Sequence, residues 1–314
     1  MKPVGVLVMA HGTPRSLDDL GAFYTEIRRG SPPPDDLLAD LERRYRAIGG
    51  TSPLNERTSA QVDGIRRALE QRAPGRFVVA AGAKFAPPRI SDALRSLGRA
   101  GVGRVVGLVL APHYSVASVG DYTRRARDAA GALGPDEGGP LDVEMIDHFH
   151  TAPGFVSLVA TRVRDALGLL PAEARLDATV LFTAHSIPAR LVDDGDPYPA
   201  QVLESATAIA ESAGLVRWSV AWQSAGRTAD AWLGPDLRDV IATLPGSGSS
   251  AAVVCPVGFV SDHLEVLYDV DIEARAVADD VGIAFARTAS LNDDPEFCAV
   301  LAGVVLDVVE PAHA

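Results

Sequence analysis

The chain has 314 residues, enough for two domains, and 47% of them are hydrophobic, which excludes an intrinsically disordered protein. Its 41 aspartates and glutamates outnumber its 29 lysines and arginines, so the net charge of -12 argues against binding a nucleic acid. Its 2 cysteines, Cys255 and Cys298, are too few for a disulfide framework, a four-cysteine zinc site or an all-cysteine iron–sulfur cluster.

The sequence also lacks membrane and export signals. No apolar run reaches the roughly 18 residues that a membrane-spanning helix needs. Residues 1–9 contain one lysine and a short apolar stretch, without the small-residue cleavage site of a secretory signal. We therefore expect a cytoplasmic protein with no stable membrane insertion.

Short valine-rich runs alternate along the chain with segments rich in alanine, leucine and arginine. The runs are typical of buried strands and comprise Val4–Met9, Phe77–Ala81, Arg104–Leu110, Asp142–Ile146, Thr179–Phe182, Trp218–Ala221 and Ala251–Cys255. The segments between them have helical spacing and comprise Ser59–Arg72, Ile90–Arg99, Tyr122–Leu133, Phe155–Leu167, Pro199–Ala213 and Leu264–Val277. This alternation predicts an α/β protein with parallel sheets.

The chain also resembles itself. Val6–Pro14 (VLVMAHGTP) matches Val180–Pro188 (VLFTAHSIP), and Val109–Ser115 matches Val254–Ser261 as strand, proline, aromatic residue and serine. Two matches in the same order predict two similarly wound halves.

The glycine- and proline-rich stretch Gly134–Pro140 is the expected boundary between the halves. We therefore expect an N-terminal half over residues 1–140 and a C-terminal half over residues 141–314, with the last helix packing back on the first half. The first half carries an additional segment over about residues 28–54.

Two histidines follow predicted strands. His185 follows Thr179–Phe182, and His11 holds the matching place in the first half. Because ligands of open α/β sheets bind beyond the carboxyl ends of the strands, we expect both histidines at a shared cleft. The alternative for His185 is a histidine that only hydrogen-bonds within a turn.

A row of carboxylates follows the buried run Val253–Val260. On an α-helix Asp262, Glu265, Asp269 and Glu273 would lie within an arc of about 80°, at 100° per residue. Oxygen ligands in such a row suit a divalent cation. The alternative is an acidic face that meets only solvent, with Asp262 in a helix-capping box.

The default ligand of such a fold, a nucleotide, lacks its phosphate-binding loop, because neither G-x-x-x-x-G-K-[ST] nor G-x-G-x-x-G after a strand occurs. The first half offers polar and basic pocket candidates instead: Arg28, Arg44, Thr51, Ser52 and Tyr122. Arginines suit a polycarboxylate, with which they pair through two hydrogen bonds at once. The alternative for each arginine is an ordinary solvated helix face.

Several motifs together resemble those of the ferrochelatases, in particular the soluble coproporphyrin ferrochelatases of Gram-positive type. They are Val6–Pro14, Tyr24–Gly30, Arg44–Leu54, Leu110–Ser115, Thr183–Pro188, Gly195–Pro199 (GDPYP), Ala221–Ser224 (AWQS), Trp232–Asp236 (WLGPD) and Pro256–Asp269 (PVGFVSDHLEVLYD). The resemblance implies insertion of Fe²⁺ into coproporphyrin III, giving coproheme in haem biosynthesis. It also implies two Rossmann-like, chelatase-type halves with the cleft between them.

The resemblance assigns the catalytic and metal-handling residues. His185 matches the family's catalytic histidine, and Glu265 matches its partner carboxylate. Metallation removes two pyrrole protons while a dication arrives, so a base that titrates near neutrality and an adjacent carboxylate suit the reaction. Asp269 and Glu273 match an acidic line that leads away from this pair, which makes these four residues the implied metal ligands.

The porphyrin-binding residues follow from the same resemblance. Arg28, Arg44, Ser52 and Tyr122 match positions that contact the propionates of the ring, and Thr51 lies in the same loop as Ser52.

Two positions depart from the family pattern. His11 stands where close relatives carry a tyrosine that faces the opposite side of the macrocycle. Because imidazole is a good iron ligand, we predict that His11 contacts the porphyrin and ligates the product iron axially. Phe85 follows Lys84 where relatives tend to place a histidine, which argues against a peripheral metal site there.

The resemblance also predicts the partners. Fe²⁺ and coproporphyrin III are expected as substrates, with no prosthetic group and no iron–sulfur cluster. A monomer that passes coproheme to a protein of the haem pathway is expected. Protoporphyrin IX is the less favoured ring. The alternatives are a non-catalytic tetrapyrrole-binding or delivery protein, and a chelatase for another metal or ring, such as cobalt with sirohydrochlorin.

Overall fold

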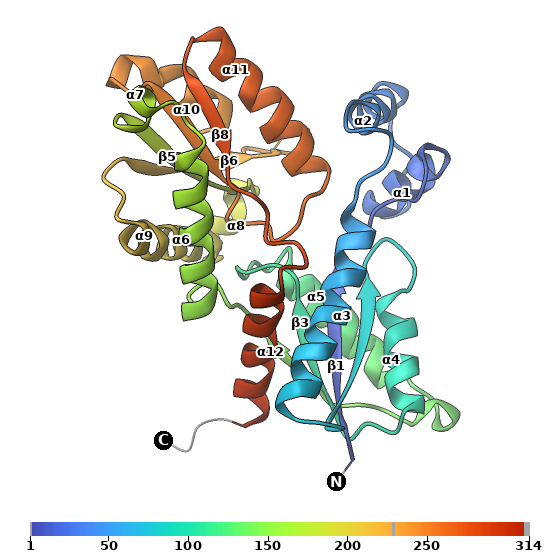
Figure 1. Cartoon of the computed structure of the whole chain (residues 1–314). Helices are drawn as coiled ribbons and strands as arrows, with labels where there is room; N and C mark the ends of the chain where they lie inside the picture. The colour runs from blue at the N-terminus through green and yellow to red at the C-terminus, as the bar shows by residue number, and fades with distance from the viewer. Residues whose placement is uncertain (1, 228–229, 311–314) are drawn as a thin grey trace.

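The computed structural model describes residues 2–227 and 230–310. Figure 1 shows two lobes, one from each half of the chain, with the C-terminal helix α12 (Pro295–Val309) at their junction. Helices α1 (Leu20–Ile27) and α2 (Asp35–Ala47) stand above the N-terminal lobe and face the other lobe.

Each lobe is built on a sheet of 4 parallel strands. The N-terminal sheet has the order β2 (Phe77–Ala83), β1 (Val4–Ala10), β3 (Arg104–Val109), β4 (Val143–Ile146). The C-terminal sheet has the order β6 (Trp218–Gln223), β5 (Ala178–His185), β7 (Ala251–Cys255), β8 (Ala284–Arg287). The second order repeats the first, with β5 in the place of β1. The predicted α/β class and the two similar halves are confirmed.

The strands form where the sequence is apolar without alternation. Every residue of β1 and β7 is buried, because both faces of a parallel sheet are covered by helices. Strand β8 escaped prediction, since its Ala-Phe-Ala-Arg segment is short and ends on a charge.

The N-terminal sheet extends beyond the boundary that we expected at residue 140. Strand β4 pairs with β3 through contacts such as Val105 with Val143, so this sheet continues to Ile146. The glycine-rich stretch that suggested the boundary is the connection between α5 and β4 within one half. Such a connection has the same composition as a linker between domains.

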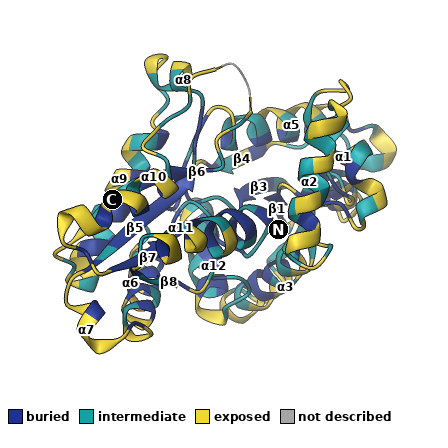
Figure 2. Cartoon of the chain, turned by 90° about the horizontal axis from the view of Figure 1, so that it is seen from above, coloured by how far each residue is buried: buried dark blue, intermediate teal, exposed yellow. Residues whose placement is uncertain are grey.

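Helices cover both faces of each sheet. Besides those already given, they are α3 (Leu54–Arg72), α4 (Ile90–Arg99), α5 (Val119–Gly131), α6 (Pro153–Gly168), α7 (Ala172–Arg175), α8 (Ala189–Asp193), α9 (Tyr198–Ala213), α10 (Leu237–Thr243) and α11 (Arg275–Asp280). A π-helix over Val266–Ala274 precedes α11. Seen from above, buried residues gather along the strands and exposed ones on the outer helices (Figure 2).

One hydrophobic core joins the lobes. It includes Val8 of the first sheet, Phe182 of the second, and Phe297 and Leu301 of α12. Burial of each such side chain stabilises the fold by about 1.5–3 kcal/mol. Helix α12 packs on α3 so closely that a Cβ atom at Gly64 would lie 2.4 Å from the Sγ atom of Cys298, so a glycine is required there.

A polar seam joins the lobes a second time, between the loop after β3 and the region of α9. The Ser115 hydroxyl donates to Asp196 at 2.8 Å, and the backbone N–H of Tyr114 donates to Gln201 at 2.7 Å. Core and seam together hold the two sheets in a fixed relation. Within residues 2–227 and 230–310, no helix has the length and apolar character needed to cross a membrane.

Candidate active site

A cavity of about 380 Å³ lies between α2 and the carboxyl edge of the C-terminal sheet. Its N-terminal wall includes Tyr24, Asp40 and Arg44, and its C-terminal wall includes His185, Ser224, Arg227, Arg238, Glu265, Asp269 and Glu273. The wall from α2 is held in place by a small apolar cluster of Leu20, Tyr45, Leu264 and Tyr268. Of the predicted residues, the structure thus brings together Arg44, His185 and three carboxylates.

A close backbone contact sets the position of the acidic segment beside His185. The N–H of Gly258 donates to the carbonyl of Thr183 at 3.0 Å, 8 residues before the π-helix begins at Val266. A Cβ atom at Gly258 would lie 2.6 Å from the Cβ atom of Ala184, so only glycine permits this approach. Glu265 therefore follows a loop that is fixed to the end of β5.

His185 presents a free lone pair to the site. Its Nδ1 lies 2.5 Å from the carbonyl oxygen of Ser186. Because a carbonyl oxygen only accepts, Nδ1 of the neutral ring carries the proton, and Nε2 carries the lone pair. His11, whose Nδ1 lies 3.0 Å from the carbonyl of Gly12, has the same tautomer by the same reasoning. Both rings can therefore accept a proton or ligate a metal through Nε2.

Unlike His185 and His11, His263 has a hydrogen-bond acceptor at each ring nitrogen. Its Nδ1 donates to the carbonyl of Ser261 at 2.9 Å, while its Nε2 lies 3.0 Å from a carboxylate oxygen of Glu265. A ring that donates from both nitrogens is a cation. Burial alone would lower the pKa of His263, but the adjacent Glu265 raises it above the usual value.

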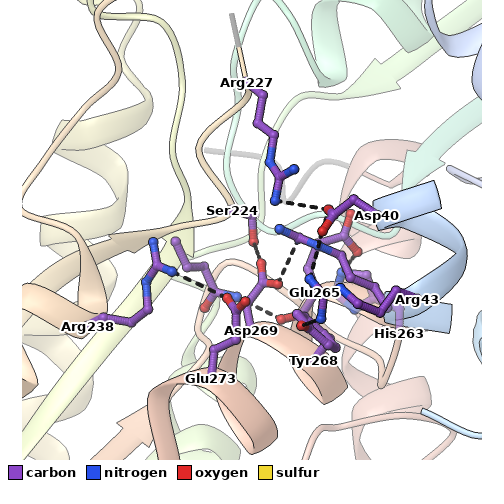
Figure 3. A network of polar contacts seen from close by, with 12 residues as sticks. Asp40, Arg43, Ser224, Arg227, Arg238, His263, Glu265, Tyr268, Asp269 and Glu273 are labelled. Atoms are coloured by element: carbon purple, nitrogen blue, oxygen red, sulfur yellow. Dashed lines mark hydrogen bonds and ion pairs between the residues drawn. The ribbon is translucent and has the colours of Figure 1, made fainter. Parts of the chain in front are cut away.

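The charge of Glu265 depends on this histidine. Burial alone would raise the pKa of Glu265, but the cationic His263, which also donates a hydrogen bond to it, holds this pKa well below the usual range. Glu265 is therefore ionised and places a negative charge at the start of the π-helix. Figure 3 shows the pair beside the polar network of the cavity.

Asp269 and Glu273 continue the acidic line along the cavity wall. Burial, together with Glu265 and Glu273, raises the pKa of Asp269 to about 6, against the opposing effects of Ser224 and Arg44. The Ser224 hydroxyl donates to one carboxylate oxygen of Asp269, and Arg44 lies 3.3 Å from the other.

The acidic segment is a π-helix and not the α-helix that we expected. Hydrogen bonds that reach five residues back widen the turn, and such turns are frequent at functional sites. Asp262 is therefore wrongly included in the predicted row. It precedes the helix, and its carboxylate accepts hydrogen bonds from Ser290 at 2.7 Å and Asn292 at 2.8 Å.

The remaining predicted residues lie outside the lining of this cavity. Arg28 stacks on Tyr24, 5.9 Å from the ring centroid, and so reaches the wall indirectly. Thr51 is exposed and Ser52 is buried in the loop before α3.

Tyr122 and His11 occupy the N-terminal lobe. Tyr122 is buried in that lobe's own core, with the ammonium of Lys84 4.3 Å from its ring centroid. The exposed His11 packs 4.7 Å from the ring of Phe85.

The four predicted metal residues do not form a ready coordination shell. Among the residues that the structure describes, no three histidine, cysteine, aspartate or glutamate side chains are grouped so that they could hold a metal ion. His185, Glu265, Asp269 and Glu273 instead line one cavity, in which each carboxylate also has a cationic neighbour.

Sequence reasoning missed several charged groups of the site. His263 was overlooked because side chains two residues apart on a helix point in different directions, whereas in the structure His263 precedes the helical turn that contains Glu265. Asp40, Arg227 and Arg238 were missed because the contacts that bring them into the site, Asp40 with Arg227 and Arg238 with Glu273, join residues that are far apart in the sequence.

Comparison with known proteins settles the family. Residues 3–308 match the family model described as Ferrochelatase. The chain belongs to the ferrochelatase family. It is 43% identical to a coproporphyrin III ferrochelatase of Geobacillus thermodenitrificans, over 97% of this chain and 96% of that protein. It is 42% identical to that of Bacillus subtilis strain 168, over 97% of both chains.

Solved structures share the fold of this ferrochelatase-family chain at low sequence identity. DR2241 from Deinococcus radiodurans, a multi-domain protein described as similar to chelatases, aligns with a TM-score of 0.58 at 14% identity, over 97% of this chain and 55% of that one. The sirohydrochlorin chelatase SirB from Bacillus subtilis subspecies spizizenii aligns with a TM-score of 0.56 at 10% identity, over 99% and 97%. Both support two Rossmann-like halves.

Replacing His263 with glutamine tests the buried pair. The change removes the cation beside Glu265, so we expect the free energy of unfolding at pH 6 to fall by about 1–2 kcal/mol, a value reduced because the carboxylate partly meets solvent. Because the pKa of His263 is raised above 6.5, its contribution is complete below that pH and is lost as the pH rises through the folded-state value. In urea unfolding, the difference between the two proteins should therefore shrink as the pH rises through that value. A difference that does not change with pH would contradict the pairing.

Proposed function

We propose that this protein inserts Fe²⁺ into coproporphyrin III and forms coproheme. The observation that carries the proposal is His185 with a free Nε2 lone pair, in one cavity with the ionised Glu265. Metallation replaces two pyrrole protons by one dication, so the site needs a proton acceptor and a fixed negative charge. The names of the relatives at 43% and 42% identity support the same ring and metal.

His185 and Glu265 have complementary roles in this proposal. Nε2 of His185 accepts pyrrole protons, while the anionic Glu265 favours the approach of Fe²⁺ and the positive charge that forms on the histidine. His263 holds Glu265 ionised. Asp269 and Glu273 offer further oxygen ligands along the same wall, which suit a hard or borderline dication in transit.

The polar groups of the N-terminal half are proposed to bind the propionates. Arg44 lines the cavity, and Arg28 is stacked on Tyr24, which lines it too. Burial raises the pKa of Tyr122 above its usual range, so its hydroxyl remains a hydrogen-bond donor suited to a carboxylate. Thr51 and Ser52 would add hydroxyl donors from the loop before α3.

The lone pair of His11 supports a separate role. We propose that its Nε2 ligates the iron of the product from the opposite face of the ring. Replacing His11 with alanine should then shift the Soret and visible bands of the coproheme complex, because an axial imidazole changes the field of the iron. An unchanged spectrum in the variant would show that His11 is not a ligand.

Partners and location are proposed on the same basis. We propose that the protein acts in the cytoplasm as a monomer and releases coproheme to an acceptor protein of the haem pathway. Gel filtration with light scattering tests the monomer.

Anaerobic incubation with three rings tests the activity. The wild type and His185→Ala are mixed with coproporphyrin III, protoporphyrin IX or sirohydrochlorin, plus Fe²⁺ or Co²⁺, and the Soret band is followed. We expect wild-type turnover with coproporphyrin III and Fe²⁺. We expect His185→Ala to bind this ring but to metallate it at least 100-fold more slowly, on the order of the loss of a general base.

Other outcomes favour the other candidates. Binding of the ring without metallation by the wild type would favour a tetrapyrrole-delivery protein. Cobalt insertion into sirohydrochlorin would favour a different chelatase. Undiminished turnover by His185→Ala would remove His185 from the proposed mechanism.

Neutralising the acidic line tests its role in metal supply. In the double variant Asp269→Asn, Glu273→Gln we expect the KM for Fe²⁺ to rise by about tenfold, with a smaller change in the KM for the ring, because two oxygen ligands lose their charge. Asp279→Asn, Asp280→Asn removes the same charge from exposed positions of the neighbouring α11 and should leave both constants unchanged. Equal increases in both constants for the first variant would contradict a metal path.

A further inference from the structure

Every carboxylate of the acidic line has a cation beside it. His263 pairs with Glu265, and Arg238 lies 3.5 Å from Glu273 (Figure 3). Arg44 lies 3.3 Å from Asp269. A dication that approaches this wall therefore competes with cations of the protein itself.

The Arg44 contact differs from the other two because it crosses between the lobes. Arg44 belongs to α2 of the N-terminal half, whereas Asp269 lies on the π-helix. Its 3.3 Å distance exceeds the roughly 2.7–2.9 Å of a strong charge-assisted hydrogen bond. Arg44 is anchored separately, because its Nε donates to Asp40 at 3.0 Å. The guanidinium can thus leave Asp269 while its helix and its main anchor stay in place.

A carboxylated ring offers Arg44 a better partner. The guanidinium lines the cavity with its side chain 22% exposed, whereas Asp269 is 9% exposed. A propionate that enters the cavity meets Arg44 from the open side and can bind it through two parallel hydrogen bonds. When the guanidinium of Arg44 moves to the propionate, one carboxylate oxygen of Asp269 loses its partner. The Ser224 hydroxyl continues to donate to the other oxygen and orients the carboxylate.

We propose that Arg44 couples the two substrates: a carboxylate of the bound ring draws Arg44 from Asp269 and so exposes this carboxylate to the incoming dication. The inference rests on the proposed function, because it requires a ring that carries carboxylates. Arg44 is then a positioning residue for the metal as well as a contact for the ring. By linkage, bound metal favours ring binding to the same degree.

Arg238 provides an internal contrast. Its guanidinium lies 3.0 Å from Asp236, and both Asp236 and Glu273 belong to the same C-terminal half as Arg238. Ring binding at Arg44 therefore leaves the Arg238 contact in place. The coupling is confined to Asp269, the carboxylate of the two that lies nearer in sequence to Glu265.

Binding of Mn²⁺ measures the coupling without turnover. Electron paramagnetic resonance titrations are carried out with and without N-methyl coproporphyrin III, whose blocked nitrogen slows metallation. We expect the ring to tighten Mn²⁺ binding by the wild type about tenfold, within the usual range for coupled sites. In Arg44→Gln, Mn²⁺ should bind about as tightly without the ring as the wild type does with it, and the ring should add no further effect.

Arg43→Gln is the matched control. Arg43 lies on the same helix and contacts Asp40 and Tyr268, but not Asp269, so this variant should keep the tenfold coupling. Equal Mn²⁺ affinity of the wild type with and without the ring, or coupling that persists in Arg44→Gln, would overturn the inference. If wild-type turnover with coproporphyrin III and Fe²⁺ is normal in that case, only the coupling fails. If the ring does not bind at all, the proposed function fails with it.

Discussion

Helix α12 buries Phe297, Leu301 and Val305 in a core that includes strands of both sheets. The site depends on this shared core, because one wall of the cavity comes from α2 and the other from the C-terminal half. Packed interiors do not deform continuously, so the core and the polar seam hold the walls at a fixed separation. A ring bound there, as we propose, would meet a rigid shape, which favours a distorted macrocycle over a flat one.

Charge is the second constraint on the site. The cavity wall carries several carboxylates, and partly buried carboxylates near one another raise each other's pKa, as Asp269 shows. Each of the three carboxylates has a cationic side chain beside it that opposes this effect: His263, Arg44 and Arg238. Two of these pairs are held differently. His263 makes hydrogen bonds through both ring nitrogens, whereas Arg44 extends to Asp269 from the other half of the chain. The proposed coupling therefore falls on Asp269, whose cationic partner belongs to the other half of the chain.

Much of the fold follows from patterns that are local in the sequence. Apolar runs such as Val4–Met9 and the helical segment Ile90–Arg99 lie where predicted. A strand buried on both faces requires a continuous apolar run, and a helix buried on one face requires apolar residues at helical spacing. The repeat around His11 and His185 correctly indicated equivalent strands β1 and β5. Strand β8 and the end of the first sheet were missed, because a short edge strand and a glycine-rich connection resemble a loop and a linker. The π-helix was missed because the carboxylate spacing also fits an α-helix.

The sequence by itself determined the α/β class, the two halves and the placement of His185 and Glu265 near strand ends, because these depend on local hydrophobic patterns and on motifs within short segments. Only the tertiary structure decided the partners of the charged groups. Arg44 and Asp269 are 225 residues apart in the chain, and no local pattern specifies their contact. The cationic state of His263 likewise requires the carbonyl of Ser261 and the carboxylate of Glu265 at opposite nitrogens, an arrangement set by the folded loop. Long-range charge pairing is fixed by packing, which brings distant segments together, and so it appears only once the chain is folded.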